Sequence, residues 1–148
     1  MKKHLHDIET FWEHFELSVQ DYTTGESFNF QINQWKDQRK ELKEYLRTFS
    51  GFSISFNGKF YDFAVLAYLD MDNYFLNEPW EVFCQKAKTF SDQLIKSDDN
   101  LFVYKYTNYK NFKFTIVDLF LYISKGVRQA KKISLKGLGI QLNYPVVQ

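Results

Sequence analysis

The sequence predicts an α+β fold, a mostly antiparallel sheet of about five to six strands packed against three to four helices in a single domain, residues 1–148. Three observations carry this prediction. Apolar residues recur at helical spacing in some segments, they alternate with polar residues in others, and the dipeptide Asn57-Gly58 is typical of a two-residue β-turn. A chain of this length can bury its own core, and its single cysteine excludes an internal disulfide.

Three segments are expected to be helices. Apolar side chains spaced three and four residues apart predict the first helix over residues 5–20. The second is expected to start at an Asn33 cap and to end near Phe49. The third is expected to start at an Asn77 cap and to carry its apolar stripe from Trp80 to Leu94.

Strands are expected between and after these helices. Residues 28–32 alternate as a half-buried strand does. The Asn57-Gly58 turn predicts a hairpin whose second strand runs on through Leu69. A second hairpin is expected to join residues 101–107 to residues 112–117.

The C-terminal part of the chain is open to two interpretations. Residues 118–132 form either a helix that begins at Asp118 or a continuation of the preceding strand. Residues 133–143 alternate weakly and are predicted to form a final strand.

Charge is distributed unevenly although the net charge is only +1. Residues 1–100 hold 17 acidic against 11 basic side chains, and residues 101–148 hold one acidic against eight basic. Either the two halves attract each other within one core, or they form two faces with different partners. No apolar stretch is long enough for a signal peptide or a membrane span, so a cytoplasmic location without membrane contact is expected.

The leading functional hypothesis is a non-enzymatic protein-binding module with no cofactor. Small aromatic-rich α+β proteins without a catalytic constellation are often inhibitors, which suggests a bacterial toxin-neutralising (immunity) protein or a phage-related inhibitor. Ten tyrosines and three tryptophans exceed what a core of this size needs, so several are expected at the surface. A cationic toxin or enzyme would meet an acidic, aromatic-rich surface, whose expected acidic residues are Asp62, Asp70, Asp72, Glu78, Glu81, Asp98 and Asp99.

Two other function classes stay open, as does a homodimer formed through a sheet edge. The first is nucleic-acid binding through the basic C-terminal third, for which the expected residues are Tyr104, Tyr106, Lys125, Arg128, Lys131 and Lys132. The second is a metal-dependent enzyme of unrecognised type, with Asp70 and Asp72 as ligands. On a helix, the histidines of the first 14 residues do not converge on one metal, and Cys84 is expected to be a buried structural residue.

Overall fold

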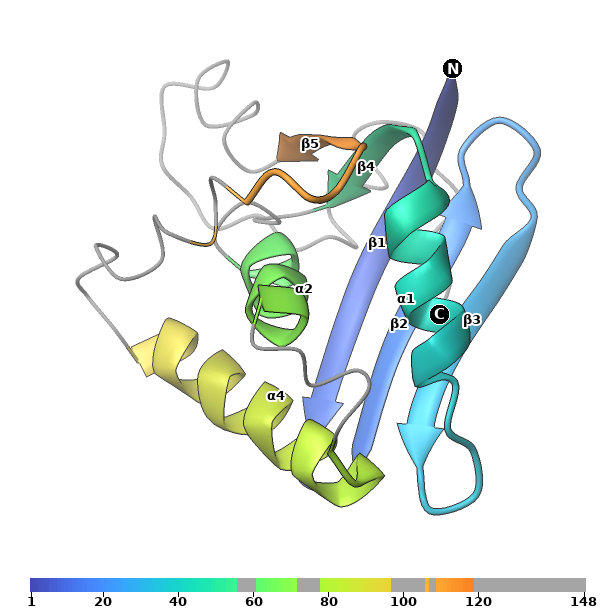
Figure 1. The fold of residues 1–148 in the computed structure, drawn as a ribbon. Coiled ribbons are helices and arrows are strands. Elements are labelled where there is room, and N and C mark those ends of the chain that lie inside the picture. The colour runs from blue at the N-terminus through green and yellow to red at the C-terminus, as the bar shows by residue number, and fades with distance from the viewer. Residues whose placement is uncertain (56–60, 72–77, 97–105, 107–108, 119–148) are drawn as a thin grey trace.

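The structure is a computed structural model that describes residues 1–55, 61–71, 78–96, 106 and 109–118 (Figure 1). Its elements, in chain order, are β1 (Lys2–Phe11), β2 (His14–Asp21), β3 (Ser27–Asn33), α1 (Arg39–Thr48), β4 (Gly51–Ser55), α2 (Asp62–Met71), α4 (Trp80–Lys96) and β5 (Thr115–Asp118).

The five strands form one mixed sheet in the order β3-β2-β1-β4-β5. β1, β2 and β3 pair antiparallel, whereas β4 runs parallel to both of its neighbours, β1 and β5. The predicted α+β class is confirmed and the strand number agrees roughly. The expected mostly antiparallel arrangement is corrected, because helical connections return the chain to the sheet in the parallel sense.

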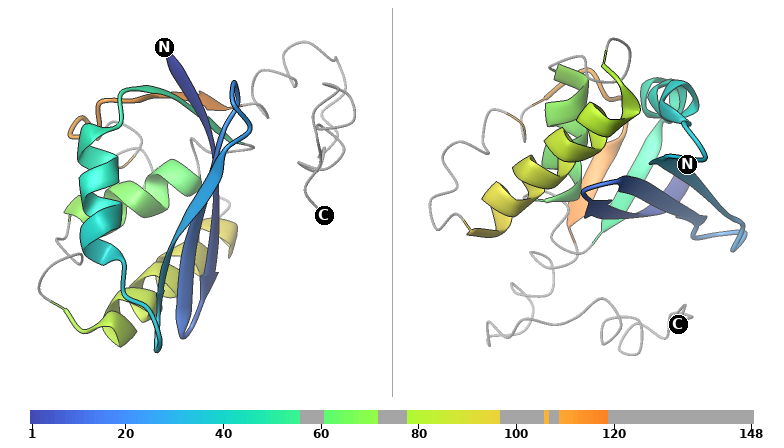
Figure 2. Two further views of the ribbon diagram at one scale, coloured as in Figure 1. Left: turned by 90° about the vertical axis from the view of Figure 1, so that its right-hand side faces the viewer. Right: turned by 90° about the horizontal axis from the view of Figure 1, so that it is seen from below.

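The three helices of the described residues, α1, α2 and α4, lie on the same face of the sheet (Figures 1 and 2). Alternate residues of β2 and β3 point into the core beneath them, including Phe15, Leu17 and Ile32, each fully buried. On α4, Phe83 meets Phe15 edge to face with 5.2 Å between ring centroids. The opposite face of β1 and β2 carries polar side chains, because successive residues of a strand point to opposite sides.

The helix predicted over residues 5–20 is wrong, since this segment forms the antiparallel hairpin of β1 and β2. Its apparent helical stripe included Trp12, which is 55% exposed in the turn. The true core positions of β1 are His4, His6 and Ile8, all buried. Two of them are histidines, so the alternation did not appear in a pattern of apolar residues.

The strand predicted up to Leu69 is also wrong, and so is the hairpin to which it belonged. β4 ends at Ser55, its two neighbours are parallel, and α2 (Asp62–Met71) occupies the second half of the expected hairpin. α2 is buried on nearly every side, including the consecutive residues 63–67. A helix that is apolar all round has no polar stripe, so it resembles a central strand in sequence. The turn Asn57-Gly58 itself lies outside the described residues.

The remaining helices and β3 agree better with the sequence. α4 confirms the third predicted helix, and β3 confirms the strand at residues 28–32. α1 begins at Arg39, later than expected, because the Asn33 side chain does not cap it. The Oδ1 atom of Asn33 instead accepts hydrogen bonds from the backbone N–H groups of Trp35 and Lys36, at 2.8 and 2.9 Å. These bonds close a turn after β3.

The C-terminal predictions are tested only up to Asp118. β5 is a strand, but it pairs parallel with β4. Most of its expected hairpin partner, residues 101–105 and 107, lies outside the described residues. The alternatives for residues 118–132 and the strand at 133–143 also lie outside them beyond Asp118. No helix in the described part of the chain is long and apolar enough to cross a membrane.

Candidate functional site

The parallel strands β1, β4 and β5 bring polar residues to one edge of the sheet. Ser55 is the last residue of β4 and lies opposite Asp118, the last residue of β5. β1 pairs with β4 as far as Leu5 opposite Ile54 and then continues, so Asp7 lies beyond the end of that pairing. In open sheets with parallel strands, ligands bind outside the carboxyl ends of the strands.

Asp62 adds a third carboxyl group to this edge. It is the first residue of α2, it follows β4 in the chain, and it is 7% exposed. Burial raises its pKa well above the usual range, and the charges of Asp7 and Asp118 raise it further. We call Asp7, Asp62 and Asp118 the carboxylate cluster.

The acidic character continues along β1 and β2. Asp7 and Glu9 share one face of β1, and Glu9 lies directly opposite Glu16 of β2. Asp7 is exposed, on the face of β1 that points away from the helices, and its pKa is raised by desolvation, with smaller contributions from Glu9 and Glu16. Like charges on directly opposed strand positions destabilise a sheet, so this arrangement costs folding free energy.

Within the described residues, little compensates these charges. No lysine or arginine there forms an ion pair with Asp7 or Asp62. The Oγ atom of Ser55 is buried and has no hydrogen-bond partner in this part of the chain. No three His, Cys, Asp or Glu side chains of the described ranges lie close enough to ligate one metal ion. Magnesium needs fewer protein ligands, because it usually binds one or two carboxylates and completes its shell with water and substrate phosphate.

The acidic residues predicted to bind a partner lie in different environments. Asp62 and Asp70 are buried in α2, Glu78 precedes α4, and Glu81 is exposed in its first turn. Asp72, Asp98 and Asp99 lie outside the described residues. The structure brings Asp62 to the carboxylate cluster rather than to Asp70, which lies eight residues further along α2. Binding of a protein by this set is untested and stays a prediction.

Asp70 is engaged in a buried contact. Its Oδ2 atom lies 2.8 Å from the Arg47 guanidinium of α1 and accepts a hydrogen bond from the Tyr109 hydroxyl. The Asp70 side chain is 1% exposed, whereas that of Arg47 is 40% exposed. Asp70 therefore has partners that join α1, α2 and the segment before β5. Metal binding by Asp70 together with Asp72, which lies outside the described residues, is untested and stays a prediction.

We expect Arg47→Met to destabilise the protein by about 1–3 kcal/mol, because it leaves the buried Asp70 carboxylate without its cation. Adding Asp70→Asn to this variant should recover part of the loss, since the uncompensated charge is then removed. Urea unfolding of the two single variants and the double variant measures this coupling. Strictly additive losses would contradict the pairing.

One residue of the nucleic-acid prediction lies in the described part of the chain, and the prediction itself is untested. Tyr106 is buried and packs edge to face on Phe90, with 5.1 Å between ring centroids, so its ring belongs to the core. Tyr104, Lys125, Arg128, Lys131 and Lys132 lie outside the described residues. Cys84 is buried as predicted, and burial raises the pKa of its thiol to about 12, which leaves it protonated and unreactive at neutral pH.

Sequence reasoning missed Asp7 and Glu9 as site residues. Interpreted as part of a helix, they were polar residues on a solvated face. On a strand, two acidic residues separated by one apolar residue project from the same face, which is the signal that Asp7-Ile8-Glu9 contained.

Three comparisons with known proteins give no further guide, since no family model, no curated protein and no solved structure matches this chain.

Proposed function

We propose that the chain is a divalent-cation-dependent enzyme that hydrolyses a phosphate ester at the carboxylate cluster. The observation that carries the proposal is the position of Asp62, buried at the carboxyl edge of the parallel strands within reach of the charges of Asp7 and Asp118. Carboxylates that share a site repel one another, and a bound metal ion replaces this repulsion by attraction. This replaces the earlier expectation that Asp70 and Asp72 hold the metal.

The chemistry follows from the ligand type. Oxygen ligands suit Mg²⁺ and Mn²⁺, which polarise phosphate oxygens and lower the pKa of bound water. Asp7, Asp62 and Asp118 would hold the cation, which would offset the negative charge that develops on the phosphate. A water molecule would attack phosphorus and release a proton to solvent while the bond to the leaving alkoxide breaks, and the alkoxide would take up a proton from solvent. The buried Ser55 hydroxyl, which has no partner among the described residues, is available to hydrogen-bond a water or a phosphate oxygen there.

Cation binding provides the first test. We expect Mg²⁺ or Mn²⁺ to raise the midpoint of thermal unfolding of the wild-type chain, with a stabilisation of about 2.7 kcal/mol at one hundred times the dissociation constant. Asp62→Asn should lose this shift. Asp92→Asn provides a matched control, because Asp92 pairs with Lys88 on the surface of α4. Ca²⁺ and Na⁺ at equal ionic strength separate specific binding from screening.

Hydrolysis is tested with bis(p-nitrophenyl) phosphate, whose cleavage releases a coloured product. The proposal expects release that requires Mg²⁺ or Mn²⁺, is lost in Asp62→Asn, and is retained in Asp92→Asn. Binding without turnover would reduce the proposal to a cation site. If the chain shows no cation binding and no turnover, the proposal is excluded.

Protein binding remains a second candidate, favoured by exposed aromatic side chains at one end of the sheet. Phe11 and Trp12 in the turn between β1 and β2 are 53% and 55% exposed, and Trp35 after β3 is 86% exposed. Aromatic residues of this kind are enriched in interface hot spots. Affinity capture followed by mass spectrometry, compared between wild type and Trp12→Ala with Trp35→Ala, tests it. A stoichiometric protein that the double variant fails to retain would support it.

A further inference from the structure

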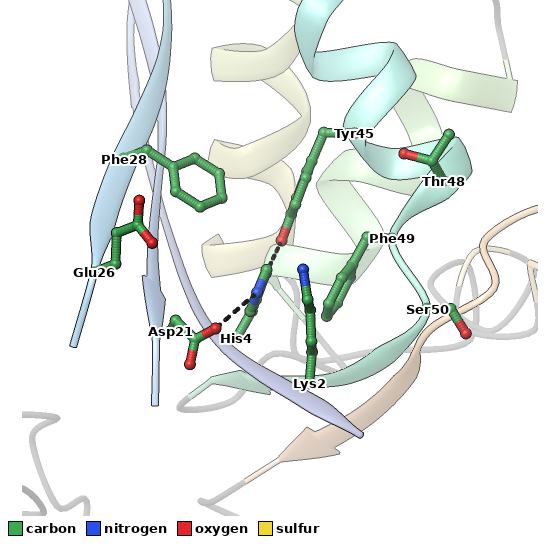
Figure 3. A pocket seen from close by; sticks show the side chains of 9 residues that line it. All are labelled: Lys2, His4, Asp21, Glu26, Phe28, Tyr45, Thr48, Phe49 and Ser50. Carbon is green, nitrogen blue, oxygen red and sulfur yellow. Dashed lines mark hydrogen bonds and ion pairs between the residues drawn. The ribbon is translucent and has the colours of Figure 1, made fainter. Parts of the chain in front are cut away.

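A row of short hydrogen bonds crosses the core at the other end of β1. The Tyr45 hydroxyl of α1 lies 2.7 Å from Nδ1 of His4 and 2.6 Å from Nε2 of His6. Nδ1 of His6 lies 2.7 Å from the Ser53 hydroxyl of β4. At the outer end, Nε2 of His4 lies 3.7 Å from a carboxylate oxygen of Asp21, the contact drawn in Figure 3.

Donor and acceptor rules give this row one direction when both histidines are neutral. Nε2 of His4 lies 3.7 Å from the Asp21 carboxylate, too far for a hydrogen bond, but the negative charge there favours hydrogen on this nitrogen, so Nδ1 of His4 is the acceptor of the Tyr45 hydroxyl. The Tyr45 oxygen then accepts from Nε2–H of His6, and Nδ1 of His6 accepts from Ser53. Between His4 and Ser53 every hydrogen of the row has an acceptor, and each tautomer follows from the network.

We propose that this row is a proton-responsive switch: when His4 takes up a proton, the row reverses, His6 changes tautomer, and the Ser53 hydroxyl of β4 loses its acceptor. A protonated His4 must donate from Nδ1, so the Tyr45 hydroxyl has to turn its hydrogen towards Nε2 of His6. His6 then carries its proton on Nδ1 and donates to Ser53, whose own hydrogen loses its acceptor. The balance is one proton gained from solvent at His4 and one proton relocated within the His6 ring.

The surroundings of His4 place this event below pH 6.5, the usual pKa of a histidine. His4 is 5% exposed but borders a surface pocket of about 430 Å³, whose wall includes Asp21, Lys2 and Glu26, so protons from solvent can reach it (Figure 3). Burial lowers the pKa of His4. The charge of Asp21 raises this pKa, and the charge of Lys2 lowers it further. The other titratable groups facing it are Tyr45 of α1 and His6 of β1. Burial raises the pKa of Tyr45, which keeps its hydroxyl a donor throughout.

The experiment is a nitrogen-15 NMR titration of the histidine side chains in the metal-free wild-type chain, because ring-nitrogen shifts distinguish the two tautomers and the protonated form. At neutral pH we expect both His4 and His6 to carry hydrogen on Nε2. On acidification, the His6 ring should change to the Nδ1–H tautomer at the same midpoint at which His4 becomes protonated. A His6 tautomer that stays constant while His4 titrates overturns the proposal.

Tyr45→Phe keeps the ring that stacks on Phe49 at 5.4 Å and removes the hydroxyl that joins the two histidines. In this variant, protonation of His4 should no longer change the His6 tautomer. Tyr61→Phe is the matched control, since the Tyr61 hydroxyl contacts Ser91 at 2.6 Å and lies outside the row. The coupled change should persist in Tyr61→Phe, and persistence in Tyr45→Phe would refute the role of the hydroxyl.

Discussion

Asp62→Asn is expected to stabilise the metal-free protein at pH 7 by about 1–2 kcal/mol, the gain usual when a strained functional position is relieved. Burial, Asp7 and Asp118 all raise the pKa of Asp62 in the folded protein. The folded chain therefore holds a proton at pH values where the unfolded chain has released it. As pH rises above about 4, the usual pKa of an aspartate, the free energy of unfolding falls, and asparagine removes this loss.

Divalent cations should make the wild-type chain more stable than Asp62→Asn, which reverses the order of stability expected without metal. The wild-type chain gains the stabilisation of a bound ion, whereas Asp62→Asn gains little. Urea unfolding at pH 5, 6, 7 and 8, each with EDTA and with excess Mg²⁺, resolves both effects. Asp92→Asn should follow the wild type in both series, because its charge lies in a surface pair on α4. A metal-free Asp62→Asn less stable than wild type at pH 7 would show that the carboxylate is stabilised by partners rather than strained.

Local sequence signals predicted the parts of this fold whose burial is one-sided. α4 carries its apolar residues on one stripe, from Phe83 to Leu94, and was predicted nearly to its ends. β3 alternates, with Phe30 and Ile32 buried, and was also predicted. Both patterns follow from a single element with one face in the core and one in water.

The misassigned segments are those whose burial depends on distant partners. His4 and His6 are buried in β1 because Tyr45 and Ser53, about forty or more residues away, satisfy their ring nitrogens. A polar side chain that becomes a core residue only through such contacts has no local signature. The same limit applies to the carboxylate cluster, since the charges of Asp7 and Asp118 act on Asp62 only in the folded chain, through contacts that no short segment encodes.

The buried histidines predict that acid destabilises the protein steeply. Burial, with a smaller contribution from His4, lowers the pKa of His6 to about 3, against about 6.5 in an unfolded chain. Between these values the unfolded chain binds a proton that folded His6 does not. The stability due to neutral His6 is therefore complete above pH 6.5 and declines as pH falls towards 3. The expected loss is about 3 kcal/mol between pH 7 and pH 4.

His6→Phe should reduce the acid limb, that is, the fall in unfolding free energy as the pH is lowered. The substitution should also lower stability at pH 7, because Tyr45 and Ser53 lose their hydrogen-bond partner. His14→Phe is the matched control, because the His14 side chain is 30% exposed on the opposite face of the sheet, so this variant should keep the wild-type acid limb. Asp62 gives a slope of opposite sign, so the titration is best performed in the Asp62→Asn background with EDTA. There, the difference in the slope of unfolding free energy against pH between 4 and 6, with and without His6, isolates the contribution of this ring. An equal slope with and without His6 would mean that the ring is solvated and protonated within the folded protein, and that the hydrogen bonds joining β1, α1 and β4 open in acid before the chain unfolds.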